Sequence, residues 1–243
     1  MSPKVPFKEA WTGQADCRLC ALRDTALFAG LRETDFEKIH QPINQFVVQP
    51  GQALYLAGES GDRMYTIRTG VVKLVQYLPD GAQRIVRLVR SSDVAGLEAL
   101  LKAPYEHDAI ALQPTEVCCL PVNTLHLLSK ENPDLHVELL KRWQRALSEA
   151  DAWLTELSTG PARERVARLL LRLVKDREPP ECQLFGREDL GAMLGITTET
   201  ASRTIAEFKR QGLLNDLGGG RYLVDTGSDG LVETEQEALD IAH

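Results

Sequence analysis

The chain has 243 residues, a net charge of −7 and five cysteines, and 43% of its residues are apolar. This length suits one large or two modest domains, and the apolar content excludes a disordered protein. The sequence contains no run of about 18 apolar residues, and its first seven residues lack the apolar stretch of a secretory signal. We therefore expect a cytoplasmic protein with no membrane partner, whose cysteines are thiols or metal ligands rather than disulfides.

The first half of the chain has the pattern of an antiparallel β domain. Residues 1–24 are an irregular extension that carries Cys17 and Cys20, and a short helix is expected near 34–40. Within 25–131, short runs rich in β-branched residues alternate with glycine turns, which predicts a barrel or sandwich. Pro79-Asp80-Gly81 predicts a hairpin. The expected strands are 45–48, 53–56, 63–67, 71–75, 84–89 and 117–120.

A long helix is expected within 132–160. Asn132 suits the N-cap, Pro133 the first helical position, and the helix should continue to about Leu157. About 26 residues of helix would span about 39 Å, more than a small domain needs. Apolar residues spaced by three and four predict a coiled-coil seam between two subunits, with packing on the chain's own domain as the alternative. The predicted dimer residues are Leu139, Trp143, Leu147, Ala150, Leu154 and Leu157.

Residues 161–226 have the pattern of a winged helix-turn-helix, and 227–243 form an acidic tail. Helices are expected over 162–174, 187–194 and 198–211, with an extended piece at 184–185 and a hairpin at Gly218-Gly219-Gly220. Residues 163–224 hold 11 Lys and Arg against 9 Asp and Glu, a net charge of +2, so the rest of the chain carries −9. This small basic excess is compatible with DNA but does not establish DNA binding.

The helix expected from 198 separates an apolar face from a polar one. Glu199, Ser202 and Arg203 lie on the polar face in the first turns, where a recognition helix contacts base edges. Arginine can bind guanine bidentately, glutamate can accept from cytosine, and serine can meet thymine. The alternative is a solvated face on which Glu199 and Arg203 pair with each other. Thr197, Thr198 and Arg221 are candidate phosphate contacts.

Over nearly its whole length the chain resembles the Crp/Fnr family of transcription regulators. The matching features are the stretch 189–203 and five glycines in order, Gly51, Gly58, Gly70, Gly81 and Gly96. The resemblance implies an α+β protein with an N-terminal antiparallel β-roll, which is a cyclic-nucleotide-binding-like jelly roll. A long dimerisation helix and a C-terminal winged helix-turn-helix would follow. It also implies a homodimer that binds double-stranded DNA and RNA polymerase and has no enzyme activity.

The Glu-x-x-Ser-Arg form at Glu199, Ser202 and Arg203 resembles the Fnr branch, which binds a TTGAT half-site. The resemblance implies that Glu199 and Arg203 face the G·C pair and Ser202 a thymine. A dimer would bind an inverted repeat with half-sites about one helical turn apart. The hairpin at Asp80-Gly81 would correspond to loops that contact RNA polymerase in the family, with a plain surface turn as the alternative.

The segment 96–109 corresponds to the phosphate cassette of cyclic-nucleotide members, but it lacks their Arg-Ser pair. Glu106 and Asp108 would repel a phosphate, so cyclic AMP is not expected. Fnr itself holds a [4Fe-4S] cluster with four cysteines, and Cys17, Cys20 and Cys118 match three of them. Ala26 stands where the third N-terminal cysteine would be, and Cys119 could serve as a ligand only if its strand bulges.

The signal therefore remains open among four possibilities. They are a [4Fe-4S] cluster, a metal-free thiol switch such as a Cys17–Cys20 disulfide, a haem or nitric-oxide sensor with His107 or His126 as a candidate axial ligand, and inert cysteines. Oxygen or nitric oxide is the expected signal under the redox and gas hypotheses. The sequence contains no nucleotide-binding Gly-Lys-Ser/Thr loop and no His-Glu-x-x-His motif, which disfavours an enzyme. The alternative from another functional class is a regulatory module that binds a small ligand.

Overall fold

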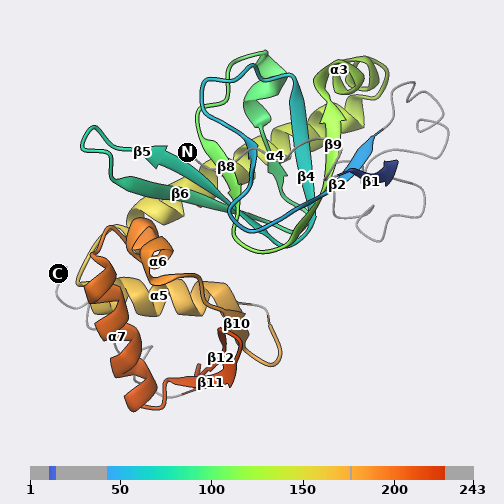
Figure 1. Cartoon of the computed structure of the whole chain (residues 1–243). Helices are drawn as coiled ribbons and strands as arrows, with labels where there is room; N and C mark the ends of the chain where they lie inside the picture. Colours follow the sequence, from blue (N-terminus) through green and yellow to red (C-terminus); the bar gives the residue numbers. More distant parts are fainter. Residues whose placement is uncertain (1–10, 15–42, 176, 228–243) are drawn as a thin grey trace. The chain divides into compact units, whose positions relative to one another are not determined.

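The computed structural model describes residues 11–14, 43–175 and 177–227 (Figure 1). Its contacts divide the chain into two units, Met1–Tyr77 with Ile85–Glu149 and Leu78–Arg84 with Ala150–His243. The short helix predicted near 34–40 and the acidic tail lie outside the described residues. No helix of the described part is long and apolar enough to cross a membrane.

The first unit is built from two antiparallel sheets, which confirms the predicted β-roll. One sheet has the order β1(Trp11–Gln14), β2(Asn44–Val48), β9(Thr115–Pro121), β4(Arg63–Thr69) and β7(Val94–Ala95). The other has the order β3(Ala53–Tyr55), β8(Asp108–Ala111), β5(Val71–Tyr77) and β6(Gln83–Arg90). All six strands predicted from the sequence are present, and β1, β7 and β8 were not predicted.

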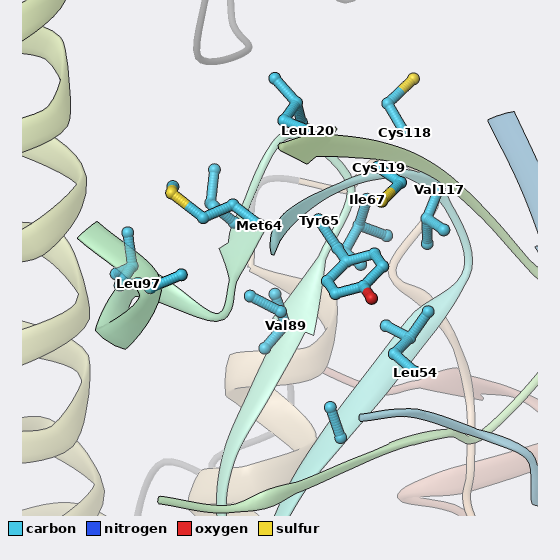
Figure 2. Packing of buried hydrophobic residues seen from close by; sticks show 14 of the residues in the cluster. Leu54, Met64, Tyr65, Ile67, Val89, Leu97, Val117, Cys118, Cys119 and Leu120 are labelled. Atoms are coloured by element: carbon cyan, nitrogen blue, oxygen red, sulfur yellow. The ribbon is translucent and has the colours of Figure 1, made fainter. Parts of the chain in front are cut away.

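The core of this unit lies on the inner sides of the strands. Val48, Met64, Ile67 and Val117 are each fully buried, and Met64 and Ile67 lie on opposite faces of β4, so both faces of this strand are covered. Figure 2 shows Met64, Tyr65 and Ile67 of β4 beside Leu54, Val89 and Leu97 from other elements. The cluster therefore joins segments that are far apart in the sequence, and burying this many apolar side chains stabilises the roll.

Helices follow the sheets. The 3-10 turn η1(Leu97–Leu101) precedes β8, and α3(Val122–Glu131), which was not predicted, follows β9. Pro133 begins α4(Pro133–Ala152), as predicted. The Asn132 side-chain amide donates to the carbonyl of Leu128 at 3.1 Å, so this side chain caps the C-terminus of α3. The helix predicted to reach Leu157 is α-helical only to Ala152, and η2(Trp153–Leu157) is a turn of π-helix.

The second unit contains α5(Ala162–Val174), α6(Arg187–Leu194) and α7(Thr198–Arg210) beside a three-stranded sheet. The sheet order is β10(Glu181–Gln183), β12(Arg221–Val224), β11(Leu214–Gly218), all antiparallel. The helices and the hairpin agree with the predicted winged helix-turn-helix. The extended piece predicted at 184–185 was misplaced, because the strand that pairs with β12 is 181–183. Leu184 instead follows that strand, and its N–H donates to the Gly220 carbonyl at 3.0 Å.

Candidate functional site

The turn between α6 and α7 is held by glycine. Gly195 ends α6 in the left-handed conformation, and its N–H donates to the Gly191 carbonyl. The N–H of Ile196 donates to the same carbonyl at 3.1 Å. Gly191 itself is buried, and a Cβ at this position would lie 2.7 Å from the Ile196 carbonyl oxygen. The two helices can therefore pack this closely only because residue 191 has no side chain.

Thr197 begins the second helix of the motif. Its hydroxyl accepts a hydrogen bond from the Thr200 N–H at 3.1 Å, as expected for an N-cap. Ala201, Ile205 and Phe208 on one face of α7 are fully buried. The cap and the buried face together fix how α7 is rotated within its unit.

The opposite face of α7 carries Glu199, Ser202 and Arg203, all exposed. Within the described part of the chain, no hydrogen bond or ion pair engages these three side chains, so the predicted alternative of an internal Glu199–Arg203 pair is not formed. Thr198, the first residue of α7, is exposed beside them. The face thus presents an acceptor, a hydroxyl and a guanidinium to an external partner.

The wing lies at the other end of the motif. Gly218, Gly219 and Gly220 all have positive φ, of 82°, 63° and 79°, which allows the tight connection between β11 and β12. Arg221 follows them and is exposed, with its nearest carboxylate, that of Glu181, 4.0 Å away. This weak, solvent-screened pair leaves the guanidinium available to a phosphate.

Helix α5 braces the recognition helix through one arginine. The guanidinium of Arg163 lies 3.3 Å from the Glu207 carboxylate and donates to the Gln211 side chain at 2.8 Å. It also lies 5.1 Å from the centre of the Phe208 ring. Arg163 therefore contacts the last turns of α7 at three points and supports its orientation, a role that no pattern in the sequence predicted.

Helix α4 has two different apolar faces. Leu135 and Leu139 are buried in the core of the β-roll, with Arg142 beside them on the same face. On the other face, Leu140, Trp143 and Leu147 are exposed by 56%, 38% and 60%, and Ala150 is half-buried. Leu154, in the π-turn η2 that follows α4, is exposed by 64%.

Two residues of the predicted dimer seam are therefore corrected. Leu139 packs on its own domain, and Leu140 takes its place on the exposed stripe. Leu157 is fully buried, because the π-turn changes the phase of the helix before this residue.

The two neighbouring cysteines of β9 lie on opposite faces of the strand. Around Cys118 and Cys119 the pairing with β2 and with β4 is regular, so the bulge that a shared cluster would need is absent at this point. Figure 2 shows their sulfurs on opposite sides of β9, with that of Cys119 on the side of Tyr65. Cys119 is thus separated from any ligand set that contains Cys118. Cys17 and Cys20 lie outside the described residues.

The environments of the described cysteines differ. Burial raises the pKa of the Cys119 thiol to about 11. Burial likewise raises the pKa of Cys182, on β10, to about 11. The sulfur of Cys118 is approached by the Arg68 guanidinium at 3.9 Å. An arginine thus lies near each β9 cysteine, Arg68 beside Cys118 and Arg63 beside Cys119, and for Cys119 the effect of burial outweighs that of Arg63.

The segment that corresponds to a phosphate cassette is occupied by carboxylates. Asp108 is buried, and its carboxylate accepts from the Ala57 N–H at 2.8 Å. Glu106 is exposed, and no arginine stands between Gly96 and Asp108. His126 bonds through its ring nitrogen Nε2 to the Leu100 carbonyl at 3.1 Å, which occupies one of its two possible ligand atoms.

Comparison with known proteins covers both units. Residues 45–132 match the family model of the cyclic nucleotide-binding domain, and residues 164–226 match that of the Crp-like helix-turn-helix domain. The fumarate nitrate reduction regulatory protein of Klebsiella oxytoca is 27% identical over 233 residues, which cover 93% of this chain and 92% of that protein. The fumarate and nitrate reduction regulatory protein of Escherichia coli K12 is 26% identical over the same shares.

Solved structures agree with these matches. FixK2 from Bradyrhizobium japonicum has a TM-score of 0.71 and 25% identity, covering 79% of this chain and 96% of that one. A CRP-family transcriptional regulator from Thermus thermophilus has a TM-score of 0.65 and 26% identity, covering 79% of this chain and 95% of that one.

Proposed function

The chain belongs to the Crp/Fnr family of transcription regulators, on its Fnr-like branch, and is a DNA-binding regulator rather than an enzyme. We propose that it binds a TTGAT-like inverted repeat as a dimer and responds to a redox or gas signal. The observation that carries the DNA part is the exposed face of α7. Glu199, Ser202 and Arg203 stand in its first turns with their polar ends unengaged within the described residues.

The chemistry of that face matches the proposed half-site. Arg203 donates two parallel hydrogen bonds to guanine, Glu199 accepts from the cytosine amino group, and Ser202 contacts thymine. Thr197, Thr198 and Arg221 bind phosphates and set the register without contributing sequence information.

A fluorescence anisotropy titration with a TTGAT-N4-ATCAA duplex and its scrambled form tests this proposal. Arg203→Ala should cost about 1–3 kcal/mol for the specific duplex alone. Arg203→Lys should lose most of the preference as well, because lysine keeps the charge but not the bidentate fork. Arg221→Ala should weaken both duplexes equally. Equal binding of the two duplexes by the wild-type protein at moderate salt contradicts the proposal.

The dimer is supported by the exposed stripe that runs along α4 into η2. Leu140, Trp143, Leu147 and Leu154 would otherwise leave a row of large apolar side chains in water. Their spacing by three, four and seven residues is that of one heptad seam. Two copies of the chain related by a twofold axis would cover these stripes mutually, and the same symmetry would present two α7 helices to an inverted repeat.

RNA polymerase is the proposed protein partner, through the hairpin between β5 and β6. The turn is closed by hydrogen bonds from Leu78 N–H to Ala82 O, 2.9 Å, and from Gly81 N–H to Leu78 O, 2.8 Å. Leu78 is 41% exposed on it. An apolar residue at the tip of a well-formed hairpin suits a protein contact, whereas a plain surface turn would tolerate its removal without effect on activation.

For the signal, the described strands support a role for the thiols. Across one sheet Gln14, the last residue of β1, pairs with Asn44, and Asn44 pairs with Cys119. Cys17 follows Gln14 by three residues, a chain length that spans at most about 10 Å. Cys17 and Cys20 themselves lie outside the described residues, so their part in the proposal rests on their order in the sequence.

A four-thiolate cluster does not fit the cysteines as they stand. Cys17, Cys20 and Cys118 supply three thiolates, Ala26 replaces the fourth, and Cys119 faces the other side of β9. A cluster would thus need a ligand of another kind, whereas a disulfide switch needs none.

Protein purified without oxygen distinguishes the hypotheses. Iron and sulfide with a broad band near 400 nm support a cluster, and a sharp Soret band supports haem. A colourless sample that loses two thiols on mild oxidation supports the disulfide.

A further inference from the structure

Three side chains near η1 form a cluster that the proposed function does not use. Glu98 comes from η1, and Glu106 with His107 comes from the loop before β8. One ligand atom from each lies within 4.8 Å of the other two. Among the described residues, this is the one group of three His, Cys, Asp or Glu side chains that lie close enough together to hold a metal ion.

The backbone that carries the cluster is held rigidly. Tyr105 donates its N–H to the Glu59 carbonyl at 3.0 Å, and its own carbonyl accepts from Gly58 at 2.8 Å. Its hydroxyl donates to the Arg63 carbonyl at 2.7 Å, and its ring stacks on Tyr55 with 3.9 Å between centres. The residue that precedes Glu106 and His107 is therefore fixed, so a ligand would meet a prearranged loop.

One atom of the cluster lacks a hydrogen-bond partner in the described part of the protein. His107 Nδ1 is buried, and the nearest acceptor, Glu98 Oε1, is 3.7 Å away, beyond a normal hydrogen bond. The imidazole of His107 therefore faces the Glu98 carboxylate across a long contact, and a cation bound by both side chains would replace that contact. Two carboxylates beside it supply negative charge that a cation would balance.

We propose that Glu98, Glu106 and His107 bind a divalent transition-metal ion of the Mn²⁺, Fe²⁺ and Zn²⁺ group, with water completing its coordination. Mixed carboxylate and imidazole ligands suit these ions. In an octahedral site with bonds of about 2.1 Å, adjacent ligand atoms lie about 3.0 Å apart and opposite ones about 4.2 Å. The Glu98–His107 separation of 3.7 Å falls between these values, so the side chains would have to adjust when the ion binds.

The test uses Mn²⁺, whose preference for oxygen and nitrogen ligands reduces competition from the five thiols. Metal-free full-length protein is titrated, and the electron paramagnetic resonance signal of unbound Mn²⁺ gives the bound fraction. We expect one ion per chain with micromolar affinity. Glu98→Gln and His107→Ala should each weaken binding at least tenfold, and Mn²⁺ should raise the Tm of the wild type but not of these variants.

His136→Ala is the matched control, because His136 is exposed on α4 and stands outside the cluster. Its affinity for Mn²⁺ should equal that of the wild type. Glu106→Gln alters an exposed side chain and should leave the fold intact. Its Mn²⁺ affinity should fall as much as that of the other two ligand variants. The proposal is overturned if 1 mM Mn²⁺ stays unbound, or if the ligand variants bind it as the wild type does. DNA binding through α7 would be unaffected by either result.

Discussion

The carbonyl oxygen of Ile196 occupies the space that a side chain on Gly191 would need. A Cβ at residue 191 would lie 2.7 Å from that oxygen, closer than such atoms approach in proteins. The contact joins the end of α6 to the turn before α7, so the geometry of the whole helix-turn-helix depends on a missing methyl group.

Gly191→Ala should therefore destabilise the second unit despite the better helix propensity of alanine. The gain of about 1 kcal/mol in propensity is outweighed by overpacking of about 1–3 kcal/mol, since the obstructing atom is backbone. Chemical denaturation followed by circular dichroism measures the difference.

Gly186→Ala is the control, because a Cβ there meets the Asp189 carboxylate at an ordinary 3.6 Å and the backbone φ is −54°. It should change stability by less than about 0.5 kcal/mol. Equal stability of the two variants would show that the turn can relax around the methyl group.

Leu147→Glu should convert the dimer to a monomer. Each copy would lose the burial of one leucine, about 2 kcal/mol, and symmetry doubles the loss to about 4 kcal/mol, roughly a thousandfold in Kd. Sedimentation equilibrium measures the constant. Leu127→Glu makes the same change at a leucine of α3 that is 63% exposed and off the stripe, and it should leave the dimer intact. Dimerisation that survives Leu147→Glu would place the interface elsewhere.

Cys119 should be the slower of the two β9 cysteines to react with iodoacetamide at pH 7.5. Burial raises its pKa to about 11, so it stays protonated at neutral pH, and the reagent attacks only the thiolate. Its rate should keep rising with pH to about 11 rather than level off near 9.

Peptide mapping by mass spectrometry at several pH values follows each site. Cys182, whose pKa burial also raises to about 11, should behave like Cys119. In guanidinium chloride the difference between Cys118 and Cys119 should disappear, because their environments become equivalent. Equal rates in the native protein would mean that β9 opens readily.

The strands and the recognition helix could be predicted because their periods are visible in the sequence. Ala201, Ile205 and Phe208 define the buried face of α7 by spacing alone, which leaves Glu199 and Arg203 outside. Strand β8 has no such period, since all four residues from Asp108 to Ala111 are buried and the first of them is an acid. Strand β7 has only two residues, too few to show a period, so it was not predicted either.

The seam on α4 shows where the period alone is insufficient. Leu139 and Leu140 both continue a three-four spacing, and the sequence does not say which one packs on the β-roll. The structure decides it, because Leu135 and Leu139 meet the core. The Glu98 cluster could not be predicted either, because Glu98 and Glu106 are eight positions apart, in a 3-10 turn and in a loop, and only the folded chain brings them together.

The π-turn Trp153–Leu157 sets a limit on the subunit contact. A π-turn holds about one residue more than an α-turn, so residues after it no longer continue the heptad phase that starts at Leu140. The stripe from Leu140 to Leu154 covers about four helical turns. Subunit affinity can therefore be tuned by exchanging side chains within those turns, whereas apolar residues placed after the π-turn would not extend the seam.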